Sequence, residues 1–388
     1  MALPITILSS GIGFRPPQGG PFKSGTSFYL FSRTVASSDH QIFKADGDDP
    51  SSGWTAQDTT NSPSNDPSTS LSVHSWLDGT TIHIGTQYNT DEVEYHEFDC
   101  STNTWSIANE SVSTTSDTTA DACSISVRSD GDVIAAYGGE QHDNMGSGYD
   151  RVDLARRETG SWTADISISG LGKTETHMRL PFVVRADATN DRMHIFYHDT
   201  TGNGLHYSTY LSGNTWGHQH TEPDTSTAAA TALNSVRAVA YDDGGTTKVR
   251  AYYVDATSLD VSVVGFDDAD SPGASISITT DISDNAPASF ASAVDDPNDT
   301  QHLLYVNSTT IYHDETGDSD DTWGTDASEL GSLTTPVIYS CNVYDNGGTV
   351  LAYLYKDGSN YRYNERTLAA AATSLVYKPN PFQHMLMR

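Results

Sequence analysis

Short runs of apolar and aromatic residues recur along this chain at a nearly constant interval. Apolar and polar residues alternate within most runs, a pattern typical of β-strands with one buried face. Successive runs begin 48 to 60 residues apart. No long segment has apolar residues at the i, i+3, i+4, i+7 spacing of an amphipathic helix, so the pattern predicts an all-β protein. The runs are FYLFSR (28–33), TIHIGTQY (81–88), DVIAAYGG (132–139), RMHIFYHD (192–199), KVRAYYVD (248–255), QHLLYVNS (301–308) and TVLAYLYKD (349–357).

Tight turns precede most of these runs, and a second strand-like run precedes each turn. Asp-Gly and Asn-Gly turns between alternating strands are the strongest short-range hairpin signal, because these residues tolerate positive φ. The sequence therefore predicts antiparallel hairpins. The turns read LDG (77–79), SDG (129–131), DATND (187–191), DDGG (242–245), DDPND (295–299) and DNGG (345–348).

Tryptophan marks a second ladder with the same period. Five of the six tryptophans follow a small polar turn, at intervals of 51, 57, 54 and 107 residues. The last interval is close to twice the others, so one tryptophan is missing near 266–274, and Tyr377 continues the ladder. We expect these side chains on outer strands, packed between neighbouring repeats. They are Trp54, Trp105, Trp162, Trp216 and Trp323.

Seven repeats of about 50 residues, each with four short strands, predict a seven-bladed β-propeller made of antiparallel strands. Stacking the blades around an axis buries both faces of each sheet and leaves only short edges. We expect ITILSSGIGF (5–14) to form the first inner strand and SLVYKPNPF (374–382) to form the last outer strand. The predicted blades of this single domain (1–388) span 1–60, 61–112, 113–168, 169–225, 226–282, 283–332 and 333–380, followed by a tail, 381–388.

The chain is strongly acidic, with 51 Asp and Glu against 20 Lys and Arg and a net charge of −31. Forty of the acids are Asp, and only six of the bases are Lys. A polyanion does not bind through phosphate neutralisation, so nucleic acid and anionic membranes are disfavoured partners. The hydrated carboxylate surface resembles that of proteins from extreme halophiles, in which salt screens the repulsion. The alternative is an ordinary acidic secreted or virion protein.

Targeting and metal signals are sparse. No stretch approaches the roughly 18 apolar residues of a membrane span, and the N-terminus lacks the basic and apolar regions of a Sec signal peptide. The three cysteines, Cys100, Cys123 and Cys341, suggest neither a disulfide framework nor a metal site. The acidic run 314–321 lacks the spacing of an EF-hand loop. We therefore assign no metal or cofactor, with Ca²⁺ at this run left as an open alternative.

The tryptophan turns resemble degenerate Asp-boxes of the sialidase-type (BNR) propellers, as in GDSDDTW (317–323). Segment 176–216 resembles a blade of the BNR-type propellers that include ulvan-lyase-like polysaccharide lyases. Those lyases carry one His at the start of an inner strand and another at the end of the next strand. The resemblance maps these positions onto His177 and His198, and it implies a propeller that acts on or binds polysaccharide.

The ligand face of a propeller is formed where inner strands begin and second strands end. The midpoint between His177 and His198 falls at the start of the turn of blade four, so we predict that they are cross-strand neighbours on that face. A ring of cationic and aromatic residues on a polyanionic body would bind an acidic sugar. The ligand-binding candidates are Arg33, Tyr88, His142, His177, Arg179, His198, Arg237 and Lys356.

A lyase needs a base, an acid and a cation that neutralises the uronate carboxylate. If the protein is an enzyme, His177 and His198 are the base and acid, and Arg179 or Arg33 neutralises the carboxylate. The resembled lyases also use a Tyr and an Arg about 16 residues apart, whereas Thr257 stands at that distance from Tyr241. No sialidase motif surrounds the arginines either. We therefore assign no catalytic residue.

Two other features allow alternative interpretations. His74 and His83 flank the turn at Asp78 and Gly79 symmetrically, which predicts a cross-hairpin pair, more typical of a surface pair than of a metal site. Trp76 lies off the tryptophan ladder and is either a core residue between blades or a platform for a sugar ring.

The sequence thus favours a non-enzymatic, surface-displayed propeller that recognises a host surface glycan or protein. A virion component of a haloarchaeal tailed virus fits the acidity and the missing export signal. Such a protein would be found on the virion surface or outside the cell, at high salt. The apolar and basic segment 377–388 could then dock onto other proteins of the particle. The alternative is a polysaccharide lyase or glycosidase that acts on an acidic polysaccharide.

Overall fold

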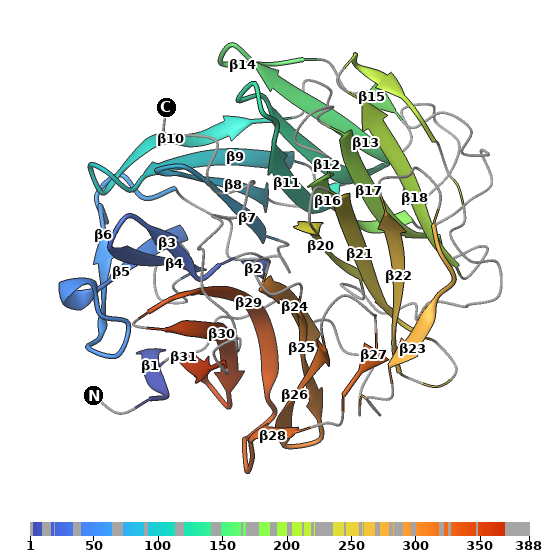
Figure 1. Cartoon of the computed structure of the whole chain (residues 1–388). Helices are drawn as coiled ribbons and strands as arrows, with labels where there is room; N and C mark the ends of the chain where they lie inside the picture. Colours follow the sequence, from blue (N-terminus) through green and yellow to red (C-terminus); the bar gives the residue numbers. More distant parts are fainter. Residues whose placement is uncertain are drawn as a thin grey trace.

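The computed structural model confirms an all-β chain wound into a seven-bladed propeller (Figure 1). Among the residues that the structure describes, helix is limited to one 3-10 turn, Asp46–Asp48. No helix in that part of the chain is long and apolar enough to span a membrane. The described residues are 3–9, 17–18, 20–33, 40–63, 73–88, 92–112, 120–140, 149–163, 166–167, 178–186, 192–199, 204–211, 213–218, 221, 236–243, 246–255, 258, 260–267, 272–278, 282, 290–295, 300–317, 322–324, 327–346 and 348–368.

The first four blades run from the axis outward in chain order, each strand antiparallel to the next. In blade three the outermost position is divided between two short strands that both pair with β13. The strands are β3 (Phe22–Ser24), β4 (Ser27–Arg33), β5 (His40–Ala45) and β6 (Trp54–Gln57) in blade one; β7 (Val73–Asp78), β8 (Thr81–Tyr88), β9 (Glu92–Asp99) and β10 (Thr104–Ser111) in blade two; β11 (Ala120–Val127), β12 (Val133–Glu140), β13 (Tyr149–Glu158), β14 (Ser161–Trp162) and β15 (Ile166–Ser167) in blade three; and β16 (Met178–Ala186), β17 (Arg192–Asp199), β18 (Gly204–Leu211) and β19 (Thr215–Trp216) in blade four.

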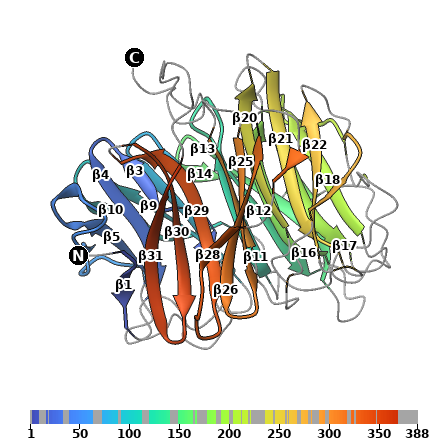
Figure 2. The same ribbon diagram turned by 60° about the horizontal axis from the view of Figure 1, so that its bottom comes forward.

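The last three blades repeat this order, and Figure 2 shows their strands running side by side between the two faces of the ring. Blade six, like blade three, divides its outermost position between two short strands. The strands are β20 (Val236–Asp243), β21 (Thr246–Val254), β22 (Val261–Asp267) and β23 (Ile276–Ile278) in blade five; β24 (Phe290–Asp295), β25 (Thr300–Asn307), β26 (Thr310–Gly317), β27 (Thr322–Trp323) and β28 (Ala327–Leu330) in blade six; and β29 (Val337–Asp345), β30 (Thr349–Asp357) and β31 (Asn360–Thr367) in blade seven.

The N-terminal strand closes the ring, and the prediction for it was wrong. β1 (Ile5–Leu8) pairs with β31 on the outer edge of blade seven, so it is an outermost strand and not the first inner one. The C-terminal run 374–382, which was predicted to fill that place, lies outside the described residues. Near the axis, β2 (Pro17–Gln18) adds a short parallel strand to β7. The alternation of ITIL fits the inner edge of blade one as well as the outer edge of blade seven. The unpaired outer edge of β31 determines that the strand pairs there.

The core is divided into seven apolar clusters, and each lies between two neighbouring blades. The five ladder tryptophans all lie on outermost strands and pack into the cluster shared with the preceding blade, as predicted. Trp54, for example, lies 5.1 Å from the ring of Tyr363 in blade seven. Between blades four and five, where the tryptophan is missing, the buried rings are Phe196, Tyr207, Tyr253 and Phe266. Trp76 packs against the cluster between blades two and three, which supports its interpretation as a core residue.

Candidate functional site

Three of the predicted glycan-binding positions lie at or next to the ends of second strands, at the level of the backbone. Arg33 and Tyr88 are the last residues of β4 and β8, and His198 is the last residue but one of β17. Equivalent strand ends of a propeller lie on the same face. The side chains of Arg33, Tyr88, Arg179 and His198, and the whole of His142 and His177, lie outside the described part of the structure, so their roles stay predictions.

In blade four, the register differs from the predicted pairing. The Cα partner of His198 is Arg179, whereas the sequence pattern placed His177 opposite it. The pairing shifts because Ala186 is opposite Arg192, which puts the centre of the turn later than the sequence suggested. The backbone positions of Arg179 and His198 are therefore directly paired between β16 and β17.

Arg237 and Lys356 are the two predicted ligand residues whose side chains are described. Arg237 is 5% exposed, and its guanidinium lies 5.6 Å from the ring centroid of Phe290 on the first strand of blade six. Burial lowers the pKa of Arg237 to about 10. Lys356 is half-buried near the end of β30. Arg237 thus belongs mainly to the contact between blades five and six, and Lys356 keeps part of its surface open.

The predicted pair of His74 and His83 does not form directly across its hairpin. Trp76 is opposite His83, and His74 is opposite Gly85, because the turn contains only two residues between Asp78 and Thr81. His83 instead lies in a buried network between blades two and three. Its Nδ1 lies 2.6 Å from the hydroxyl of Tyr95, which donates to Glu97 at 2.5 Å. Since that hydroxyl has one proton, Nδ1 of His83 is the donor in the first bond.

An arginine from the next blade completes this network. Arg157 of β13 pairs with Glu97 at 3.4 Å and with Glu110 at 3.1 Å, and its guanidinium lies 5.3 Å from the ring centroid of Tyr95. Burial, with a smaller effect from Arg157, lowers the pKa of His83 to about 3. The carboxylates of Glu97 and Glu110 in blade two are therefore neutralised by Arg157 of blade three.

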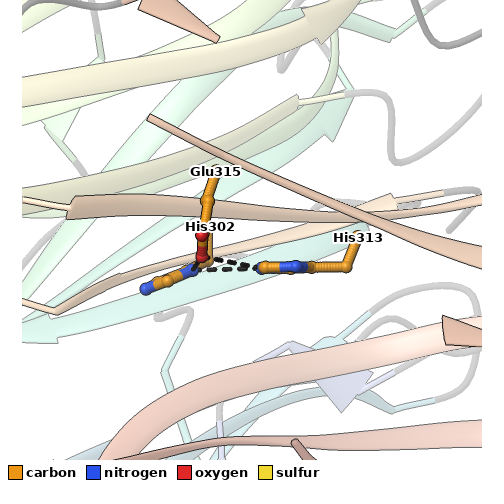
Figure 3. A group of neighbouring side chains, drawn as sticks. All are labelled: His302, His313 and Glu315. Carbon is orange, nitrogen blue, oxygen red and sulfur yellow. Dashed lines mark hydrogen bonds and ion pairs between the residues drawn. The ribbon is translucent and has the colours of Figure 1, made fainter. Parts of the chain in front are cut away.

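Blade six carries a different group at the same place in its sheet. His302 on β25 is opposite Glu315 on β26, and His313 precedes Glu315 by two residues on the same face (Figure 3). Nδ1 of His302 lies 3.1 Å from Nε2 of His313. Oε2 of Glu315 lies 3.4 Å from Nδ1 of His302 and 3.8 Å from Nε2 of His313. Both imidazoles are 2% exposed, whereas the Glu315 side chain is 52% exposed, so this group opens to solvent on the carboxylate side.

The protonation of this group follows from its surroundings. Burial, with smaller effects from the nearby His302 and Arg366, lowers the pKa of His313 to about 3. A hydrogen bond from His302 lowers the pKa of the Glu315 carboxyl. Across the interface, Arg366 of blade seven donates to Glu329 of β28 at 2.7 Å. Near neutral pH, the group therefore presents an imidazole lone pair and an ionised carboxylate.

Sequence reasoning missed the group of His302, His313 and Glu315. A signal was present, because the two-residue turn at 308–309 fixes the register and places His302 across from an HxE motif. The acidic run at 314–321, considered for Ca²⁺, does not form one cluster among its described members. Asp314 is buried opposite Leu303, and neighbouring Glu315 is opposite His302 on the other face of the strand.

Comparisons with known proteins support the architecture. Neither a protein-family model nor a curated protein matches this sequence. The BP39L lectin from Burkholderia pseudomallei is similar in structure, with a TM-score of 0.61 and 11% identity over 92% of this chain and 99% of that chain. A polysaccharide lyase, the PL25 ulvan lyase bound to -[GlcA(1-4)Rha3S]-, has a TM-score of 0.57 and 9% identity over 94% of this chain and 97% of that chain. At such identities the likeness shows the shared fold, which does not by itself establish activity.

Proposed function

We propose that this chain is a non-enzymatic propeller that binds an acidic surface glycan. The proposed face is formed by the ends of β4, β8, β17 and β30 and the starts of β16 and β20. The observation that supports the proposal is the strand topology. Arg33 and Lys356 lie at or near the ends of second strands, and Arg179 lies near the start of an inner strand, so their backbone positions share one face of a chain that has few cations. A cation beside hydrogen-bonding groups suits a uronate or sulfate ester.

The similar structures support a carbohydrate ligand. One is a lectin, and the other is a polysaccharide lyase that holds a fragment containing GlcA. We further propose display on a particle or cell surface at high salt, where a host glycan or glycoprotein is the partner. The acidic composition favours the virion of a haloarchaeal tailed virus as this setting. Segment 377–388, which lies outside the described residues, is the proposed contact with other proteins of the particle.

A carbohydrate-active enzyme, either a polysaccharide lyase or a glycosidase, is the second candidate. The observation that favours it is the register of blade four, which puts Arg179 directly opposite His198. A lyase pairs a cation that neutralises the carboxylate with a base that removes the neighbouring proton. The two candidates differ in whether the bound chain is cut.

The decisive experiment incubates the protein in multimolar KCl with acidic polysaccharides and with whole cells. Co-sedimentation reports binding, and unsaturated-uronate absorbance together with reducing ends reports cleavage. We expect binding without new ends, and we expect Arg179→Gln and Lys356→Gln to weaken it. Lys44→Gln is the matched control. Lys44 lies near the end of β5 that is away from Arg33 and the proposed face, and it pairs with Asp48.

Each outcome is informative. Cleavage that is lost in His198→Ala would make the protein an enzyme and overturn the non-enzymatic proposal. Absence of both binding and cleavage would overturn the glycan proposal in either form. Equal weakening by Lys44→Gln would attribute the binding to overall charge instead of to the proposed face.

A further inference from the structure

We propose that His302, His313 and Glu315 form a binding site for a divalent transition metal ion, with Zn²⁺ as the best match. The site lies on the face of blade six that packs against blade seven. The proposal does not depend on glycan binding, because these residues are distinct from those of the proposed glycan face.

The geometry fits a tetrahedral ion. Bonds of 2.0–2.1 Å to nitrogen and oxygen place neighbouring tetrahedral ligands about 3.3 Å apart. The three ligand atoms are separated by 3.1, 3.4 and 3.8 Å. They lie on one hairpin whose register is fixed by the β25–β26 ladder, so an ion can enter with side-chain adjustments alone.

The chemistry of the donors selects the metal. Two imidazole nitrogens and one carboxylate oxygen suit Zn²⁺ and its neighbours in the first transition series, whereas Ca²⁺ and Mg²⁺ prefer oxygen ligands. Nε2 of His302 is buried and has no hydrogen-bond partner among the described residues. In the free protein, Nδ1 carries the proton that His302 donates to Glu315. When an ion binds Nδ1, the ring proton moves to Nε2, so the neutral imidazole offers its Nδ1 lone pair to the ion.

Three protein ligands leave one coordination position for another group. Glu315 is the exposed member of the three, so the free position faces the solvent side of the cluster. Zinc sites with three protein ligands keep their fourth position for water or for an incoming ligand. An anionic group of a partner molecule is therefore a suitable fourth ligand.

Blade two provides an internal comparison. His83 and Glu97 occupy the positions of His302 and Glu315, but Tyr95 stands where blade six has His313. Glu97 there is already paired with Arg157. In blade six, the corresponding arginine, Arg366, pairs with Glu329. Among the described residues, Glu315 has the two histidines within ion-pair distance. Of these two equivalent groups, the one in blade six therefore has three metal ligands, whereas the one in blade two does not.

The test titrates the chelator-treated full chain with Co²⁺ in high salt and records the visible absorption of the ion. We expect one equivalent of Co²⁺ to give the intense bands of a four-coordinate site and to be displaced by Zn²⁺. His313→Gln should weaken binding at least tenfold, and Glu315→Gln, at an exposed side chain, should weaken it without risk to folding. His83→Gln in blade two is the matched control and should leave the bands unchanged.

Circular dichroism and the melting temperature of each variant separate loss of metal binding from loss of folding. The proposal is overturned if no intense bands develop, or if Glu315→Gln and His313→Gln bind Co²⁺ as the parent does. It is also overturned if His83→Gln abolishes the bands to the same extent. A melting temperature that rises with Zn²⁺ in the parent and not in folded Glu315→Gln would support it further.

Discussion

At the scale of single residues, the interior of this acidic protein holds several neutral histidines. Burial lowers the pKa of His83, His96 and His194 to about 3 in each case. His96 accepts the backbone N–H of Asn109 at Nδ1 and contacts the hydroxyl of Thr86 through Nε2, so both ring nitrogens are used. His194 packs against Phe196 and Phe266. These side chains act as polar members of the core.

These histidines predict loss of stability in mild acid. Their folded pKa lies below the unfolded value of 6.5, so the unfolded chain binds more protons between pH 6.5 and 3. The free energy of unfolding should therefore fall as the pH drops through this window, by up to about 1.4 kcal/mol per pH unit for each histidine. Urea unfolding at pH 7, 6, 5 and 4 measures this slope.

The variant His194→Phe isolates one histidine from the carboxylates that also titrate in acid. Nδ1 of His194 has no hydrogen-bond partner among the described residues, so phenylalanine replaces a ring in an aromatic pocket. We expect the pH slope of the variant to be smaller by about one proton. An unchanged slope would contradict the assigned neutral state of His194.

Close packing between blades predicts the effect of a single methyl group. A Cβ at Gly85 would lie 2.5 Å from Sγ of Cys123 in the next blade. Gly85→Ala should destabilise the protein by about 1–3 kcal/mol through overpacking. Adding Cys123→Ala removes the sulfur and should recover most of that loss. Denaturant unfolding of the two single variants and the double variant measures the coupling, and additive effects would contradict the clash.

At the scale of elements, the ring depends on one short strand. β1 is four residues long, yet it covers the edge of β31 that would otherwise be open to other strands. Ile5 is buried opposite Tyr363, and the next residue, Thr6, is exposed. The strand thus joins the start of the chain to the last blade.

A charge on the inward face of β1 should open the ring. Ile5→Asp places a carboxylate at a buried position opposite Tyr363, and we expect a loss of several kcal/mol together with self-association through the freed edge. Thr6→Asp adds the same charge on the exposed side and should have little effect. Thermal melting and size-exclusion chromatography compare the two, and equal behaviour would contradict closure by β1.

At the scale of the whole molecule, 31 excess negative charges repel one another across a ring built from many small interfaces. The chain has only 20 Lys and Arg for its 51 Asp and Glu, and a described cation such as Arg157 already binds two carboxylates, those of Glu97 and Glu110. Most carboxylates must therefore be screened by ions from the solvent. The screening length falls from about 10 Å at 0.1 M salt to about 3 Å at 1 M.

Salt should raise the melting temperature steeply in this range. If screening is the cause, KCl and K₂SO₄ should act alike when they are compared at equal ionic strength below about 0.5 M, where most of the screening develops. Above that range, sulfate should stabilise more, because it strengthens burial of apolar surface. Differential scanning fluorimetry over a salt series measures both effects. A flat response to KCl would contradict the interpretation of the acidic surface.

The sequence by itself determined the blade count, the hairpins and the outer tryptophans, because alternation, turn chemistry and repeat length are local properties that seven copies reinforce. The tertiary structure alone decided which end of the chain closes the ring, because ITIL fits any strand edge and only the open edge of β31 selects it. It also decided register, which moved the partner of His198 from His177 to Arg179. The group of His302, His313 and Glu315 depends on the same physical fact, since cross-strand neighbours are set by pairing and not by distance along the chain.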